Sequence, residues 1–156
     1  MRIGGVDPKT LPCEEILVLP RGDQQIVFRA TGIKDMEEFT RLCPEPEPPK
    51  KLTKGGPTTD TEDKGYKEAV KIYEKRRTAY VLLRSLQPSE IEWDTVKFDG
   101  PSTWLNWEED LKNAGLSTIE CGRVLHLVMQ ANSLDEEKLE QARKLFLQGT
   151  PAPSEE

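Results

Sequence analysis

The sequence predicts an α+β protein that is mainly α. Three observations support this prediction: two apolar runs flank a turn sequence near the N-terminus, prolines cluster in the following segment, and apolar residues recur at helical spacing over most of the remaining chain. We therefore expect a ββα hairpin-helix module over residues 1–43, a proline- and glycine-rich linker over 44–64, a C-terminal helical bundle over 65–148 and a disordered tail over 149–156.

The N-terminal module is predicted from the apolar runs at residues 16–19 and 25–29, which flank the turn sequence Pro20-Arg21-Gly22-Asp23. Their β-branched and aromatic residues favour strands, whereas proline, glycine and aspartate favour the turn between them. The Arg-Gly-Asp tripeptide also occurs in integrin ligands, but we assign it to the turn. Farther on, Asp35 is positioned to cap a short helix that ends at Cys43.

The linker is predicted from its composition. Residues 44–64 contain five prolines and the pair Gly55-Gly56, and Leu52 is their only large apolar residue. Closely spaced prolines favour an extended polyproline II conformation, whereas glycine and threonine leave the chain flexible. We expect a stiff first half and a flexible second half.

The longest helix is predicted over residues 65–86, where apolar residues recur at intervals of three and four. Tyr66, Tyr73 and Tyr80 recur every seven residues beside this apolar stripe. A stripe of this width has to be buried against another element or a partner. The three tyrosines that edge it are therefore candidate protein-binding residues.

The rest of the bundle is predicted from local signals. Residues 91–98 alternate well enough to form a short strand or an extended arm. Capping-box sequences then begin at Asn106, Ser117 and Ser133 and predict three further helix starts. Because the connections between these helices are short, we expect antiparallel neighbours in one bundle.

Composition argues against several classes of partner. The formal net charge of −6 makes a polyanion such as nucleic acid an unfavourable partner. The N-terminus lacks the apolar core of a signal peptide, and the longest apolar run, residues 79–83, is too short for a membrane span. Three widely spaced cysteines and one histidine fit free thiols in a reducing cytosol better than a metal site. We expect a cytoplasmic protein that binds no nucleic acid, membrane or cofactor.

The polar clusters have structural explanations that compete with catalysis. His126 is predicted on the polar flank of its helix and Cys121 on the buried face, so we expect no Cys-His nucleophile. The acidic run at residues 108–110 lies in a first helical turn, where negative charge suits the helix dipole. An active site would require the fold to bring together acidic residues such as Asp94 and Asp99. We therefore expect that the chain is not an enzyme.

Tryptophan is concentrated in one part of the chain. Trp93, Trp104 and Trp107 lie within fifteen residues of one another, in a segment with few aliphatic neighbours. Packing in a core would explain this cluster. The alternative is an aromatic contact patch, because tryptophan is enriched among the residues that dominate protein interfaces. The three tryptophans are therefore also candidate protein-binding residues.

Several short segments resemble the tail assembly chaperones of tailed bacteriophages. The N-terminal likeness covers residues 11–15 (LPCEE), 26–30 (IVFRA) and 35–39 (DMEEF), in the order of a strand pair that leads into a helix. The C-terminal likeness covers residues 73–80 (YEKRRTAY) and 129–135 (MQANSLD), and the likeness as a whole touches about half the chain. The linker at residues 44–64 departs from the more compact members of the family.

The resemblance implies a non-enzymatic protein of the infected bacterial cytoplasm. Such a protein would bind the tape-measure protein, help tail tube subunits polymerise around it and be absent from the finished virion. Two alternatives use the same modules: a minor virion structural protein of the tail or neck, and a general protein-binding adaptor. A homo-oligomer is compatible with all three interpretations.

Overall fold

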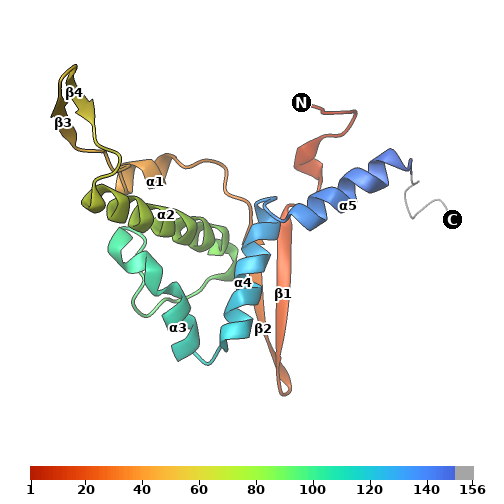
Figure 1. Ribbon diagram of the computed structural model, residues 1–156. Coiled ribbons are helices and arrows are strands. Elements are labelled where there is room, and N and C mark those ends of the chain that lie inside the picture. Colours follow the sequence, from red (N-terminus) through yellow and green to blue (C-terminus); the bar gives the residue numbers. More distant parts are fainter. Residues whose placement is uncertain (150–156) are drawn as a thin grey trace. The chain divides into compact units, whose positions relative to one another are not determined.

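The structure is a computed structural model that describes residues 1–149 (Figure 1). Helix accounts for 49% of the chain and strand for 17%, which confirms the predicted α+β, mainly α class. The predicted disordered tail, apart from Gly149, lies outside the described residues. In chain order, the strands and α-helices are β1 (Glu14–Arg21), β2 (Gln24–Thr31), α1 (Glu37–Leu42), β3 (Lys50–Thr53), β4 (Gly56–Thr59), α2 (Lys64–Ser85), α3 (Trp107–Asn113), α4 (Thr118–Ala131) and α5 (Glu136–Leu147).

The chain divides into two compact units that differ from the expected modules. Of the described residues, the first unit comprises 1–32, 85–90 and 119–149, and the second comprises Ile33–Arg84 and Ile91–Thr118. The N-terminal hairpin is thus grouped with α4 and α5 rather than with α1. A physical reason is that a two-stranded hairpin is only marginally stable unless it covers its apolar face with another element.

The first unit is built on the β1–β2 hairpin. The two strands pair antiparallel from Glu14 opposite Thr31 to Arg21 opposite Gln24. Gly22, in the turn, has a φ of +58°, a left-handed conformation that glycine adopts without steric cost. One face of the hairpin carries the buried side chains Leu19, Phe28 and Ala30, and α4 of the same unit buries Val124, Leu127 and Val128.

Polar contacts connect the hairpin to the other segments of the first unit. The Arg21 guanidinium lies 2.6 Å from the Glu120 carboxylate at the start of α4. A short 3₁₀ helix, Gln87–Ser89, lies beside β2, where Arg29 N donates to Ser89 Oγ at 2.7 Å and Ser89 Oγ donates to Arg29 O at 2.6 Å. At the end of α4, Asn132 Nδ2 donates to the buried Ser85 hydroxyl at 2.8 Å.

Gly32 marks a close backbone approach in this unit. A Cβ atom at Gly32 would lie 2.7 Å from the Ala131 carbonyl oxygen, and a backbone oxygen cannot move away as easily as a side chain. We expect Gly32→Ala to lower the free energy of unfolding by about 1–3 kcal/mol, measured by urea denaturation. Gly122→Ala is the control, because its Cβ meets nothing within 4 Å and alanine favours the interior of α4. Equal effects of the two changes would contradict this explanation.

The second unit has an aromatic core. The Phe39 ring of α1 lies 5.3 Å from the Tyr73 ring and 5.5 Å from the Tyr80 ring of α2, measured between centroids. Trp104, from the 3₁₀ helix Pro101–Asn106, lies 6.1 Å from Phe39 and 5.4 Å from Tyr80. These separations and tilted orientations are typical of favourable aromatic pairs.

The connection between α2 and α3 is held by a buried carboxylate. Residues 91–98 form no strand, and the segment bends at Asp94 and Thr95. Asp110 of α3 accepts hydrogen bonds from Thr95 N at 2.9 Å, Thr95 Oγ1 at 2.7 Å and Val96 N at 3.2 Å. Burial by itself would raise the pKa of Asp110, but these hydrogen bonds outweigh it and lower the pKa below its ordinary value. The Asp110 side chain is therefore ionised, and its hydrogen bonds hold Thr95 and Val96 in place.

The predicted linker contains an element that the composition did not indicate. Within residues 44–64, β3 and β4 pair antiparallel from Lys50 opposite Thr59 to Thr53 opposite Gly56. Gly55 and Lys54 form the turn between them, and all of the strand side chains lie towards solvent, including Leu52 at 88% exposure. The glycines that predicted flexibility instead permit a tight turn, and the threonines favour strands.

Two predicted helix starts differ from the structure. Ser133 has a left-handed φ of +56°, and Asp135 caps α5 instead by accepting hydrogen bonds from the amides of Glu137 and Lys138. The Asn106 side chain makes no capping bond to α3. Asn106 is itself the last residue of the 3₁₀ helix Pro101–Asn106, so the chain passes directly from one helix into the other and α3 has no separate start for a cap.

Candidate protein-binding surface

The apolar side chains of α5 are exposed. Every residue of this helix is exposed, and Phe146 and Leu145 retain 83% and 55% of their accessible surface. Leu139, Ala142 and Phe146 follow one another at intervals of three and four, so they share one face of the helix. We define the α5 surface as the exposed side chains of Leu134, Leu139, Ala142, Leu145, Phe146 and Leu147.

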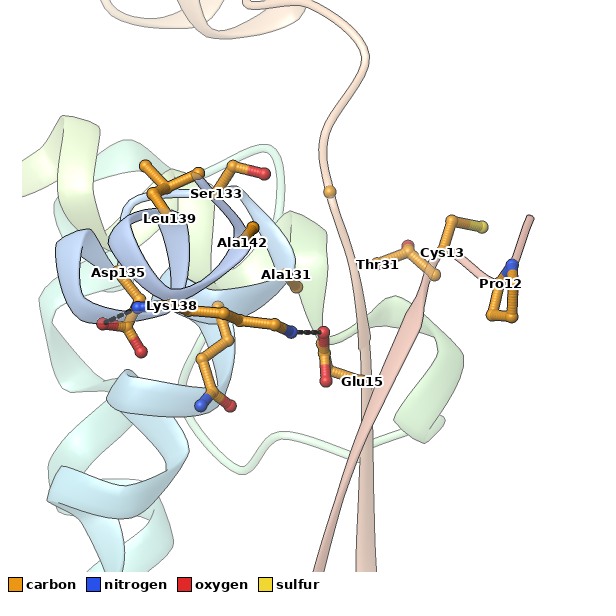
Figure 2. Close-up of a pocket in the computed structure, with 12 residues that line it drawn as sticks. Pro12, Cys13, Glu15, Thr31, Ala131, Ser133, Asp135, Lys138, Leu139 and Ala142 are labelled. Carbon is orange, nitrogen blue, oxygen red and sulfur yellow. Dashed lines mark hydrogen bonds and ion pairs between the residues drawn. The ribbon is translucent and has the colours of Figure 1, made fainter. Parts of the chain in front are cut away.

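Ionic contacts attach the first turns of α5 to the rest of the first unit. The Lys138 ammonium pairs with the Glu15 carboxylate at the start of β1 (Figure 2). His126 Nε2 lies 3.5 Å from the Asp135 carboxylate, which also caps the helix. These polar contacts hold the first turns of α5 without burying its apolar face.

A cavity of about 410 Å³ lies beside these first turns. Pro12, Cys13 and Thr31 line it from the hairpin side, and Leu139 and Ala142 line it from α5, as Figure 2 shows. The cavity continues the α5 surface, because Leu139 and Ala142 belong to both. It has room for an apolar side chain of a bound segment.

Several polar groups in and near the cavity have partners within the chain. Glu15 and Lys138 form an ion pair, and Asp135 accepts backbone hydrogen bonds in its capping role. The Cys13 thiol is exposed, whereas Cys43 and Cys121 are buried. His126, the only histidine, lies 3.2 Å from the Gln130 amide on the same helix.

The acidic residues that the sequence offered for a catalytic site are Asp94, Asp99 and Glu108. Asp94 and Asp99 are exposed. Glu108 lies 3.2 Å from the Lys112 ammonium one turn along α3. Among residues 1–149, no group of three or more histidine, cysteine or acidic side chains is arranged to hold a metal ion.

The six aromatic residues predicted to bind protein all belong to the second unit. Trp104 is 0% exposed and Tyr80 is 2% exposed, so both are core residues, which for Trp104 is the packing alternative considered above. The half-buried Tyr73 contacts the same cluster through Phe39. A protein-binding role for the other three, also half-buried, stays a prediction: Tyr66, Trp93 and Trp107.

The environments of the tyrosines differ. Burial raises the pKa of Tyr80 and of Tyr73, so both hydroxyl groups remain protonated near neutral pH. Tyr73 also lines a second hollow, of about 230 Å³, together with Pro46, Ile72 and Arg76. Of the predicted aromatic residues, Tyr73 therefore combines core packing with a surface position.

Sequence reasoning missed the α5 surface because it assigned the apolar face of this helix to a bundle core. The sequence did contain a sign of this surface, the run Leu145-Phe146-Leu147 at the end of the helix. Three consecutive apolar residues point in different directions around a helix, so one packed face cannot bury all of them. None of the helices in the described part of the chain is both long and apolar enough to span a membrane. Comparisons with protein-family models, curated proteins and solved structures find no match for this chain.

Proposed function

We propose that this protein has no catalytic activity and works by binding a helical segment of another protein through the α5 surface. The observation that carries the proposal is the exposure of one apolar face of α5, which ends with the 83% exposed Phe146 in the last turn of the helix. An apolar face that is left in water gains about 25 cal/mol for each Å² that a partner covers. Binding to an amphipathic helix is a common way to cover such a face.

The proposed client is the tape-measure protein of a tailed phage, with the tail tube protein as a second partner. This choice follows the resemblance to tail assembly chaperones, whose long helical client would offer apolar stripes to the α5 surface. The proposed place of action is the cytoplasm of the infected bacterium. The net charge of −6 supports a protein partner over a nucleic acid.

The role of the α5 surface is tested with two matched substitutions in one helix. We expect Phe146→Ser to weaken binding to a co-purified tape-measure protein about tenfold or more, because burying a phenylalanine contributes roughly 1.5–3 kcal/mol. Gln141→Ser is the control, because it introduces the same residue at an exposed position outside the α5 surface. Both affinities are measured by isothermal titration calorimetry.

Two outcomes would contradict the proposal. One is equal affinity for the client in both variants, which would place the binding site elsewhere. The other is the absence of any complex when the chain is co-expressed with the long helical protein encoded next to it.

A minor virion structural protein is the alternative that uses the same surface. Mass spectrometry of purified particles separates the two roles. The chaperone role predicts that the chain is missing from finished virions, whereas a structural role predicts a fixed copy number.

A further inference from the structure

The N-terminal hairpin has two edges with different surroundings. At the edge of β2, the backbone N–H and C=O groups of Arg29 are both bonded to the Ser89 hydroxyl. Within residues 1–149, the outer edge of β1 has no corresponding backbone partner. A strand edge of this kind is a template for pairing with another strand.

The register identifies which residues of β1 face this open edge. Residues that lie opposite each other in an antiparallel pair either bond to each other or both point outward. Because Arg29 bonds outward to Ser89 and lies opposite Ile16, the backbone groups of Ile16 also point outward. By alternation, the outward set of β1 is Glu14, Ile16, Val18 and Pro20.

The outward set is accessible. All four residues are exposed, and the Ile16 and Val18 side chains retain 54% and 47% of their surface. Val27, opposite Val18, is 37% exposed on the same face of the hairpin. Pro20 occupies an outward position, where its missing N–H removes no bond within the hairpin.

We propose that the open edge of β1 pairs with β1 of a second copy of this chain, antiparallel about a two-fold axis, with Ile16 opposite Val18 of the second copy. The two hairpins then form one four-stranded sheet. In this register each outward N–H, from Glu14, Ile16 and Val18, meets a carbonyl of the other strand. The position opposite Glu14 is Pro20, which needs only to accept a hydrogen bond.

The side chains support this register. The pairing brings Leu17 of one copy opposite Leu17 of the other, on the face that packs against α4. A shallow hollow of about 90 Å³ at this edge is lined by Ile16 and Leu17 of β1 and by Leu127 of α4. On the opposite face, Ile16 meets Val18, so aliphatic pairs form on both faces of the new sheet.

The distribution of charge supports a second copy as the occupant. β1 begins with Glu14 and Glu15 and ends with Arg21. An antiparallel pair places the acidic end of each strand beside the basic end of the other, so no like charges lie opposite each other. The edge is therefore complementary to itself, and this inference holds whether or not α5 binds a client.

The full chain is tested by sedimentation equilibrium with two proline variants. We expect the wild type to reach twice its 17.7 kDa mass as concentration increases. Val18→Pro should raise the dimer dissociation constant roughly tenfold or more, because each dimer loses two interchain hydrogen bonds at the centre of the paired segment. Val27→Pro is the matched control, because it removes an outward N–H at the same level of the hairpin on the edge of β2. It should leave the dimer unchanged.

Amide hydrogen exchange of the wild type tests the same proposal without any substitution. Protection of the Ile16 and Val18 amides should increase with protein concentration, while that of the Val27 amide should not. A wild type that stays monomeric into the millimolar range would overturn the proposal. So would a dimer that tolerates Val18→Pro, or one in which only the edge of β2 gains protection, since another strand would then form the contact.

Discussion

Replacing Trp104 with alanine is expected to lower the free energy of unfolding by about 3–5 kcal/mol. Trp104 is 0% exposed, and its ring contacts Phe39 and Tyr80 in the aromatic core of the second unit. Its indole N–H donates to the carbonyls of Lys97 and Phe98, both at 3.1 Å. The substitution thus leaves a large cavity and removes a buried donor from two acceptors.

Equilibrium urea denaturation, followed by circular dichroism, measures this effect. Trp104→Phe serves as an intermediate case, because it keeps an aromatic ring in the core and removes the indole donor. We expect its cost to lie well below that of alanine. Trp107→Ala is the surface comparison, because that side chain is only half-buried. Similar losses for Trp104→Ala and Trp107→Ala would contradict the assignment of Trp104 as the central core residue.

Asp110→Ala is expected to lower the free energy of unfolding by about 3 kcal/mol at neutral pH. The substitution leaves the partly buried amide of Thr95 and the buried amide of Val96 without their acceptor, and hydrogen bonds to a charged group contribute about 1.5–3 kcal/mol each. Glu109→Ala is the control, because its neighbouring carboxylate is exposed. The control should stay within about 0.5 kcal/mol of the wild type.

The same substitution should alter the response of stability to acid. The pKa of Asp110 is lower in the folded protein than in the unfolded chain, where the pKa of an aspartate is about 3.9. Its ionised form therefore contributes full stability above the unfolded pKa, and this contribution is lost as the pH falls through the folded pKa. The difference between the wild type and Asp110→Ala should be constant near neutral pH and shrink in that acidic window. A constant difference down to the lowest pH would contradict this role of the Asp110 charge.

The sequence predicted those elements that depend on local signals. The turn at Gly22 and the three-four spacing that ends near Leu86 are properties of a few neighbouring residues, and the structure has both the hairpin and α2. The grouping of the hairpin with α4 depends on contacts across about a hundred residues, such as Arg21 with Glu120. Neither charge alone indicates the other, so the division into units could not be inferred.

The candidate surface shows the same limit. Periodicity predicts that one face of a helix is apolar, but it does not tell whether this face lies in a core or on a surface. Trp104 and Phe146 were both recognisable as large apolar residues, and only the fold separates the buried ring from the exposed one. The anchoring pair of Glu15 and Lys138 lacked any sequence signal, because its members are distant along the chain.

The discontinuous first unit has a consequence for protein synthesis. Its hairpin is complete once Thr31 has left the ribosome, but α4, which covers the apolar face of the hairpin, begins only at Thr118. At a translation rate of about 5–20 residues per second, the ribosome needs roughly 4 to 20 s after Thr31 to synthesise α4, and Phe28 and Leu19 stay uncovered during this time. During this interval the second unit can form from the segment being translated. The hairpin is therefore synthesised well before the helix that buries its apolar face, and a cellular chaperone that binds exposed apolar strands would find its target there during translation.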